Sequence, residues 1–268
     1  MILCLDAGNS HLVGGVFEAE ALLLQFRRSS QGQPTSDEMG VFLRTALREN
    51  GIEPQRIDAI ALCSVVPDLV HSLRNGCLKY FGKEPFVLQA GVKTGLKIRY
   101  RDAREVGADR IADAIAALHQ FPNQNLIVIN FGTATAIEAI SRDKEYLGGA
   151  ILPGVRLSME ALETRTARLP AVEIIQPEDV VGRSTTQCIQ SGLYFGTLGA
   201  VRLFIAQITR DTFRGEGPTV VATGGFSSLY RDEVDFHHVL PDLTLQGVRL
   251  AFELNASATV VRQQRAAP

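Results

Sequence analysis

One short pattern occurs twice in the sequence, and this repeat constrains the fold more than any other feature. The two copies are LCLDAGNS, residues 3–10, and IVINFGTA, residues 127–134. In each, an apolar strand-like run leads into Asp or Asn, a spacer, a glycine and small polar residues. A second apolar run follows each copy, over residues 12–17 and 136–140. The repeat therefore predicts two strand–turn–strand hairpins in a chain built from two similar halves.

The composition of such a turn suits it to phosphate. Its backbone N–H groups can bind phosphate oxygens while the leading carboxylate faces a metal ion. Two such hairpins facing each other would hold a nucleoside triphosphate from both sides. A single DxGxS pattern is also what an ordinary hairpin turn contains, so the second copy carries the inference.

The rest of the chain alternates strand patterns with helix patterns, which predicts the α/β class with mixed sheets. Further strands are expected over residues 21–27, 57–63, 85–88 and 219–223. Helices are expected over residues 36–50, 67–80, 104–120, 154–168, 184–212 and 242–254. Gly148-Gly149 and Pro153-Gly154 predict a turn. We expect an N-terminal lobe over residues 1–117, a C-terminal lobe over 118–255 and a flexible tail over 256–268.

Composition excludes several classes of protein. The net charge of the 268 residues is −2, and no basic face predicts nucleic-acid binding. The four cysteines form no CxxC pair, and Cys4 and Cys63 lie in apolar runs that predict buried free thiols. No signal peptide is evident, and no apolar run approaches the roughly 20 residues that span a bilayer. We expect a soluble cytoplasmic protein with no nucleic-acid or membrane partner.

Six motifs follow one another along the chain. They are DAGNS at 6–10, GADR at 107–110, NFGTAT at 130–135, GGAILPG at 148–154, GRST at 182–185 with QSGLYFG at 190–196, and ATGG at 222–225. Each is weak alone. In this order and spacing they resemble the type III pantothenate kinases, within the actin-like ATPase and sugar-kinase superfamily. The resemblance covers residues 1 to about 255.

The resemblance implies a fold and an activity. The fold would be two duplicated ribonuclease-H-like lobes with mixed sheets and an ATP cleft between them. The activity would be ATP-dependent phosphorylation of pantothenate to 4′-phosphopantothenate, the first step of coenzyme A biosynthesis. Members of the family are homodimers with the pantothenate site at the subunit interface, so we expect a homodimer whose contact involves the helix over 184–212.

The resemblance also implies roles for individual residues. Asp109 matches the catalytic general base, which agrees with the need for a carboxylate to accept the hydroxyl proton, and Arg110 suits a carboxylate substrate. The positions matching the ATP site are Asp6, Ala7, Gly8, Asn9, Ser10, His11, Leu12, Val13, Thr133, Gly224 and Gly225. The positions matching the pantothenate site are Tyr100, Gly107, Ala108, Asp109, Arg110 and Thr185. Asp6 would serve Mg²⁺ through the phosphates.

The chain departs from the family pattern most clearly at Asn130, where the family has the Asp that carries K⁺ or NH₄⁺. An amide oxygen can coordinate a cation but brings no formal charge, so the site should be weaker or the requirement relaxed. Two alternatives stay open. One is a non-catalytic regulatory protein on the same fold, and the other is a kinase for a different small hydroxy acid.

Overall fold

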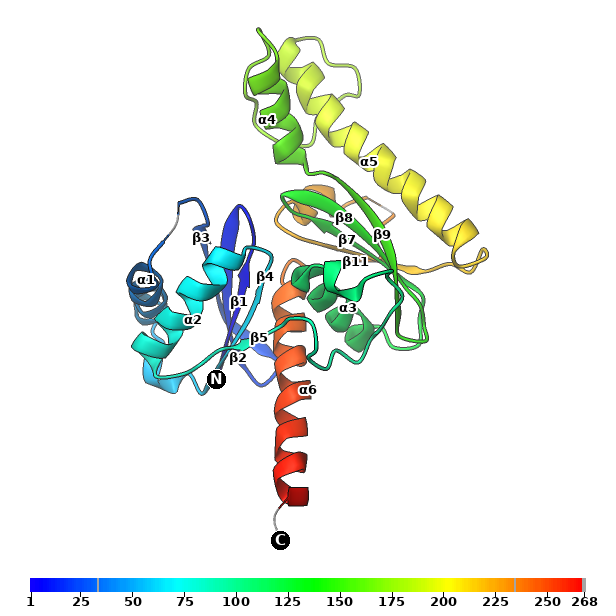
Figure 1. The fold of residues 1–268 in the computed structure, drawn as a ribbon. Coiled ribbons are helices and arrows are strands. Elements are labelled where there is room, and N and C mark those ends of the chain that lie inside the picture. Colours follow the sequence, from blue (N-terminus) through cyan, green and yellow to red (C-terminus); the bar gives the residue numbers. More distant parts are fainter. Residues whose placement is uncertain (33, 234, 267–268) are drawn as a thin grey trace. The chain divides into compact units, whose positions relative to one another are not determined.

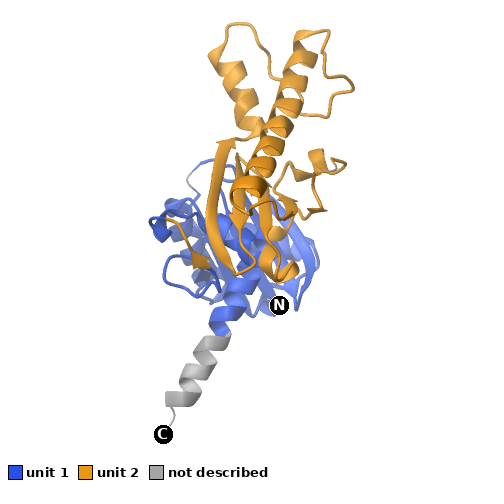
Figure 2. Ribbon diagram, turned by 90° about the vertical axis from the view of Figure 1, so that its right-hand side faces the viewer, with its two compact units in different colours: residues 1–96, 101–116, 244–268 blue, residues 97–100, 117–243 orange. Residues whose placement is uncertain are grey.

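The computed structural model describes residues 1–32, 34–233 and 235–266, with side chains described as far as Ala256. The chain forms two compact units (Figure 2). Unit 1 holds residues 1–96, 101–116 and the chain from 244, and unit 2 holds residues 97–100 and 117–243. The units differ from the predicted division at 117/118, because the C-terminal helix clusters with the N-terminal residues and four residues near position 100 cluster with unit 2.

Unit 1 is built on a five-stranded mixed sheet with the strand order β3-β2-β1-β4-β5 (Figure 1). Its strands are β1 (Ile2–Ala7), β2 (His11–Glu18), β3 (Ala21–Ser29), β4 (Ala59–Ser64) and β5 (Phe86–Val87). Its helices are α1 (Ser36–Glu49), α2 (Pro67–Phe81), the start of α3 (Ala108–Gln120) and α6 (Leu243–Ala266), with short 3-10 turns at Pro54–Arg56 and Ala103–Glu105. Strands β1, β2 and β3 are antiparallel neighbours, whereas β4 and β5 run parallel to β1.

Unit 2 is built on a six-stranded sheet with the order β11-β10-β7-β8-β9-β6. Its strands are β6 (Lys97–Ile98), β7 (Leu126–Phe131), β8 (Ala134–Ile140), β9 (Glu145–Pro153), β10 (Thr219–Thr223) and β11 (His238–Val239). Its helices are α4 (Val155–Arg165) and α5 (Thr185–Asp211), with a 3-10 turn at Ser227–Tyr230. Strands β7, β8 and β9 are antiparallel neighbours, and β10 and β11 run parallel to β7.

The two sheets share one topology, so the repeat in the sequence is a repeat of fold. Strands β7 to β11 have the order and directions of β1 to β5, with β6 as an added edge strand on β9. Asp6 lies opposite Val13 in its hairpin, and Asn130 lies opposite Ala136 in the other. The predicted fold class, α/β with two duplicated mixed-sheet units, is confirmed.

Each unit has its own apolar core. In unit 1, Leu3 and Leu5 of β1 pack with Leu43 of α1 and Leu73 of α2. The α1 helix begins at a capping box, in which Glu38 N–H donates to the Thr35 hydroxyl and Thr35 N–H donates to the Glu38 carboxylate. In unit 2, separate residues of β7, β8, β10 and α5 form the core. Cys4 and Cys63 are fully buried free thiols, as predicted.

Helix α6 packs closely on α3, the helix that begins with the GADR motif. A Cβ at Gly247 would lie 1.9 Å from the Ala112 carbonyl oxygen, so only glycine permits this approach. The Thr244 hydroxyl donates to the buried carboxylate of Asp113 over 2.6 Å. The C-terminal helix therefore holds the helix that carries Asp109, which explains why it belongs to unit 1.

Two predicted elements are wrong in kind or extent. Gly148 and Gly149 lie inside β9 rather than in a turn. A Cβ at Gly149 would lie 1.7 Å from the Ile137 carbonyl oxygen, so this glycine serves close strand pairing. The helix expected from residue 104 begins at Ala108, after the 3-10 turn at Ala103–Glu105. The flexible tail was predicted over residues 256–268. From residue 257 onward the side chains lie outside the described part of the structure.

Among the described helices, α5 has the length and apolar composition that could cross a membrane, although the sequence predicted no such run. One-third of its most apolar window is buried in the structure. A core helix of a globular protein meets the same two criteria.

Candidate functional site

The first predicted phosphate turn joins β1 to β2 in unit 1. Gly8 N–H donates to the His11 carbonyl oxygen over 3.0 Å, which closes the turn. Ala7 and Leu12 on either side are fully buried, so of the predicted ATP residues these two can offer only backbone. The others in this segment are partly or fully exposed: Gly8, Asn9, Ser10, His11 and Val13.

Asp6 lies at the end of β1, directly before this turn. Its neighbour across the parallel strand β4 is Cys63, whose thiol donates to Asp6 Oδ1 over 3.2 Å. Burial of the carboxyl group, reinforced by the nearby Asp109 carboxylate, raises the pKa of Asp6 to about 7 against the Cys63 hydrogen bond. Asp6 and Asp109 are therefore electrostatic neighbours within unit 1.

Asp109 lies in the first turn of α3, the position that the sequence predicted. Its Oδ1 accepts a hydrogen bond from Arg110 N–H over 2.8 Å. Burial raises the pKa of Asp109, and the Arg110 backbone and guanidinium oppose that rise. A Cβ at Gly107 would lie 2.5 Å from Asp109 Oδ1, so the glycine leaves room for the carboxylate. A partly exposed carboxylate with a raised pKa is suited to accept a proton.

This pair of carboxylates can accommodate Mg²⁺ only together with a ligand. Among the described residues, no group of three or more His, Cys, Asp or Glu side chains could hold a metal ion. Mg²⁺ in kinases is commonly held by one or two carboxylates plus substrate phosphates. Asp6 with nucleotide phosphates fits that arrangement, and a cation there would favour the ionised forms of both Asp6 and Asp109.

The second predicted phosphate turn joins β7 to β8 in unit 2. Gly132 N–H donates to the Ala134 carbonyl oxygen, and Gly154 N–H donates to the Thr133 carbonyl oxygen, each over 3.1 Å. A Cβ at Gly154 would lie 2.3 Å from that Thr133 oxygen. Thr133 is exposed at the tip of the turn, so its side chain and backbone are presented as a phosphate-binding turn requires.

Asn130 and Gly224, predicted for different ligands, lie together in unit 2. Gly224 has φ +90°, and a Cβ there would lie 2.4 Å from Asn130 Oδ1. The neighbour of Asn130 on β10 is Thr223, at the position that Cys63 takes beside Asp6. The Thr223 hydroxyl is buried and has no hydrogen-bond partner among the described residues. An amide oxygen and a hydroxyl are neutral oxygen ligands, which fit a weakly held cation. Gly225 is exposed beside them.

Tyr100 belongs to unit 2 although Gly107, Ala108, Asp109 and Arg110 follow in unit 1. It comes directly after the edge strand β6 and is half-buried. Its ring lies near that of Tyr146, with centroids 6.3 Å apart, and against the backbone of Gly148.

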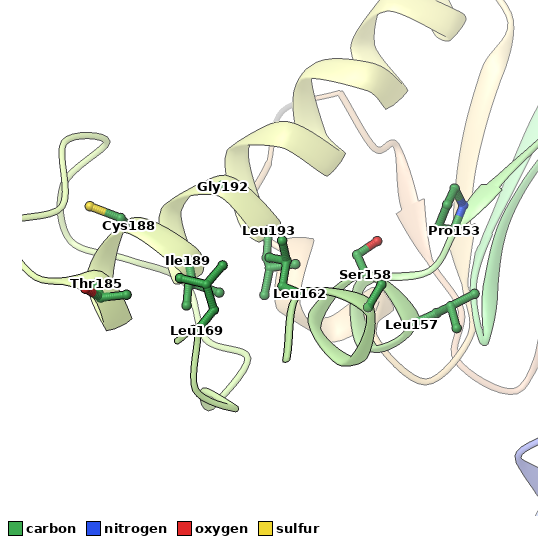
Figure 3. Close-up of a pocket in the computed structure, with 11 residues that line it drawn as sticks. Pro153, Leu157, Ser158, Leu162, Leu169, Thr185, Cys188, Ile189, Gly192 and Leu193 are labelled. Atoms are coloured by element: carbon green, nitrogen blue, oxygen red, sulfur yellow. The ribbon is translucent and has the colours of Figure 1, made fainter. Parts of the chain in front are cut away.

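Thr185 begins α5, where the Ser184 hydroxyl caps the helix by accepting from Gln187 N–H over 3.2 Å. The residue lines an apolar groove of about 820 Å³ between α4 and α5. Figure 3 shows Thr185 and Cys188 at one end of this groove and Pro153, at the end of β9, at the other. The groove lining is almost entirely aliphatic and offers little for an anionic ligand.

The structure therefore divides the predicted site residues between the two units. Asp6, the first turn and the GADR motif lie in unit 1, whereas Tyr100, Asn130, Thr133, Thr185 and the paired glycines lie in unit 2. Sequence analysis missed Cys63, Tyr146 and Glu138 as neighbours of site residues. Cys63 could have been identified only from the register of β1 and β4, which pairs it with Asp6. Tyr146 could have been identified only from the register of β6 and β9.

Comparison with known proteins gives a consistent picture. The family model for type III pantothenate kinases matches residues 2–207. The type III pantothenate kinase of Legionella pneumophila (strain Corby) is 58% identical over 257 residues, 96% of this chain and 100% of that protein. The enzyme of the same name from Elusimicrobium minutum (strain Pei191) is 48% identical over the same shares.

Among solved structures, a putative Baf family transcriptional activator from Campylobacter jejuni superposes with a TM-score of 0.60. The match covers 95% of this chain and 99% of that one at 17% identity. At that identity the likeness shows a shared fold and nothing about activity.

Proposed function

This chain belongs to the type III pantothenate kinase family, and from that premise we propose how its residues carry out the reaction. The enzyme is an ATP-dependent kinase that phosphorylates pantothenate to 4′-phosphopantothenate, the first step of coenzyme A biosynthesis. The observation that carries the proposed mechanism is the proximity of Asp6 and Asp109, two carboxylates with raised pKa values in one unit.

In the proposed reaction, Asp109 accepts the proton of the pantothenate hydroxyl. The hydroxyl oxygen forms a bond to the γ-phosphorus as the bond from that phosphorus to the bridging oxygen of ADP breaks. Arg110 binds the pantothenate carboxylate, Gly107 and Ala108 bring backbone close to it, and Tyr100 and Thr185 complete the pantothenate contacts. Asp6, together with the nucleotide phosphates, would hold Mg²⁺, and the ion would supply neutralisation of the charge on the transferred group.

The ATP contacts are proposed from both turns. In unit 1 these are Asp6 and residues 7–13, with buried Ala7 and Leu12 acting through backbone. In unit 2 these are Thr133, at the exposed tip of its turn, and the glycine pair Gly224 and Gly225. Two observations support a glycine that lets the ligand approach the backbone at position 224. Gly224 has a positive φ, and a side chain there would collide with Asn130.

The test is an assay of ADP release coupled to a spectroscopic readout, with pantothenate as the acceptor. We expect turnover that depends on pantothenate and exceeds the turnover with other small hydroxy acids. No pantothenate-dependent turnover would favour a regulatory protein on this fold. A higher kcat/KM for another hydroxy acid would assign the chain to that substrate.

The same assay tests Asn130. Because the Asn130 amide brings no formal charge, we expect turnover to change less than about twofold when K⁺ or NH₄⁺ is replaced by a bulky organic cation at equal ionic strength. In the Asn130→Asp variant, K⁺ should become stimulatory because a carboxylate attracts the ion. A strong K⁺ requirement in the unaltered protein would contradict this reading of Asn130.

We also propose a homodimer in which α5 and its surroundings form the contact. Figure 1 shows α4 and the first half of α5 extending beyond the sheet of unit 2. Large apolar side chains are exposed on α4, along α5 and on the neighbouring segments of unit 2: Ile151, Leu157, Val180, Val181 and Leu203. Exposed apolar surface of this kind is common where subunits meet.

The cytoplasm, where ATP is available, is the proposed compartment.

Light scattering coupled to size exclusion measures the oligomer directly. We expect a species of twice the 29.1 kDa chain mass at micromolar concentration. Adding charge to the exposed face, as in Leu203→Glu, should shift the mass toward the monomer. A monomer at every concentration tested would remove the dimer and its proposed interface.

A further inference from the structure

Tyr100 is held by unit 2 through a short strap of chain. Residues 97–100 cluster with unit 2, although the residues on both sides belong to unit 1. Strand β6 pairs in parallel with β9, with Ile98 opposite Tyr146. Lys97 N–H donates to the Lys144 carbonyl oxygen and Arg99 N–H to the Tyr146 carbonyl oxygen, each over 2.9 Å. The pairing of β6 with β9 therefore fixes the position of Tyr100 relative to β9.

Two residues of β9 form the surface against which the Tyr100 ring lies. Gly148 has φ +110°, and a Cβ there would lie 3.3 Å from Tyr100 Cε2. The Tyr146 ring lies on the same side, tilted by 54° with its centroid 6.3 Å from that of Tyr100. A Cβ at position 148 would require the Tyr100 ring to shift by a few tenths of an ångström, and the Tyr146 ring is the second group that lies near it.

A buried carboxylate fixes the Tyr146 ring in turn. Tyr146 is fully buried, and its hydroxyl donates to the carboxylate of Glu138, which is 1% exposed. The strand register of β8 and β9 shifts at Ala139/Ile140, opposite the Tyr146–Gly148 segment. Bulges of this kind re-aim side chains and are common beside functional sites. A buried carboxylate is costly unless it is hydrogen-bonded, so the Tyr146 hydroxyl is held firmly.

We propose that Tyr146 and Glu138 are positioning residues that, with Gly148, orient Tyr100 for substrate and so set the affinity for pantothenate. The inference rests on the proposed function, since it requires that Tyr100 contacts pantothenate. It adds two residues, neither in contact with ATP or the reacting atoms, that determine how the acceptor is recognised. They should affect pantothenate binding and leave phosphoryl transfer largely unchanged.

The experiment compares steady-state constants of single variants. Tyr146→Phe removes only the hydroxyl, and we expect the KM for pantothenate to rise about 3- to 10-fold, with the KM for ATP and kcat within about twofold. Gly148→Ala should also raise the KM for pantothenate.

The matched controls are Tyr194→Phe and Gly215→Ala. Tyr194 is a buried tyrosine of unit 2 whose hydroxyl donates to Glu233 over 2.6 Å. Gly215 has φ +85°, and no atom of the described residues beyond its chain neighbours lies within 4 Å of an added Cβ. Both should leave the KM for pantothenate unchanged.

A second readout reports the ring without activity. The chain contains no tryptophan, so Tyr100→Trp introduces a single tryptophan at this position, which can be excited selectively over the tyrosines. Its emission should shift and become more accessible to acrylamide when combined with Tyr146→Phe, and should not change with Tyr194→Phe. Equal emission in Tyr100→Trp alone and in its combinations with Tyr146→Phe and Tyr194→Phe would overturn the inference, whatever the kinetic constants of the variants.

The Tyr100→Ala variant distinguishes a failure of the positioning role from a failure of the proposed function. A raised pantothenate KM in Tyr100→Ala, with Tyr146→Phe and Gly148→Ala unchanged, overturns the positioning role and leaves the proposed function intact. An unchanged KM in Tyr100→Ala overturns the assignment of Tyr100 itself and the inference with it. A raised KM in all three, with both controls unchanged, supports the proposal.

Discussion

Replacing Asp109 by Asn is expected to lower kcat by about 10²–10⁴-fold. The amide keeps the size of the carboxylate and can still accept from Arg110 N–H, which lies 2.8 Å from Asp109 Oδ1. It cannot accept the proton of the substrate hydroxyl. Burial raises the pKa of Asp109, so the carboxylate is a stronger base than an ordinary aspartate while being ionised at neutral pH once a cation is bound nearby.

The measurement is ADP release at saturating ATP and pantothenate. Asp102→Asn is the matched control, because Asp102 lies in the same unit and forms an ion pair with Arg104 outside the proposed site. Its kcat should stay within about twofold of the unaltered protein. The unaltered enzyme should also lose activity as the pH falls through the raised pKa of Asp109, whereas Asp109→Asn should show no such limb. Near-normal turnover in Asp109→Asn would mean that the base lies elsewhere.

Replacing Asp6 by Asn should have opposite effects on activity and on stability. Activity should fall by at least about 10²-fold, because the residue proposed to hold Mg²⁺ with the phosphates loses its charge. The unfolding free energy of the ligand-free protein should rise, because the variant no longer buries a charge, and no longer places one near Asp109. Asn can still accept the Cys63 hydrogen bond, so the packing of β1 on β4 is retained.

The sign of the stability effect follows from the pKa of Asp6. In the folded chain it is about 7, against an ordinary value of 3.8, so the folded state binds the proton more tightly. Stability from this group is complete below about pH 4 and is lost as the pH rises to about 7. Asp6→Asn should therefore gain about 1–3 kcal/mol at pH 8, less at pH 5.5 and nothing near pH 4, allowing for the partial exposure of the residue.

Urea unfolding at these three pH values, with chelator present, measures the effect. Asp58→Asn is the control of opposite sign. The N-terminal ammonium donates to Asp58 and lowers its pKa, so this substitution should reduce stability at pH 8. A loss of stability in Asp6→Asn at pH 8 would show that the Asp6 carboxylate is already compensated in the ligand-free protein.

Much of the local structure was predictable because its determinants lie close together in the sequence. The β1–β2 and β7–β8 hairpins follow from apolar runs around Gly8 and Gly132. The capping box of α1 needs only Thr35 and Glu38. Gly148 and Gly149 were misread because paired glycines mark turns and close strand contacts equally. The collision of a Cβ at 149 with Ile137 decides between them, and that neighbour lies on another strand.

The sequence by itself determined that the chain contains two copies of one sheet topology, because motif spacing and strand periodicity are local properties. Its motifs also made Asp6 and Asp109 the acidic candidates for the site. Only the tertiary structure decided that Asp109 helps to raise the pKa of Asp6, that Cys63 donates to Asp6, and that the Tyr100 ring lies against Gly148 and near Tyr146. Each of these contacts joins segments that are separate in the chain. Its energy comes from burial and strand register, which no pattern within one segment can encode.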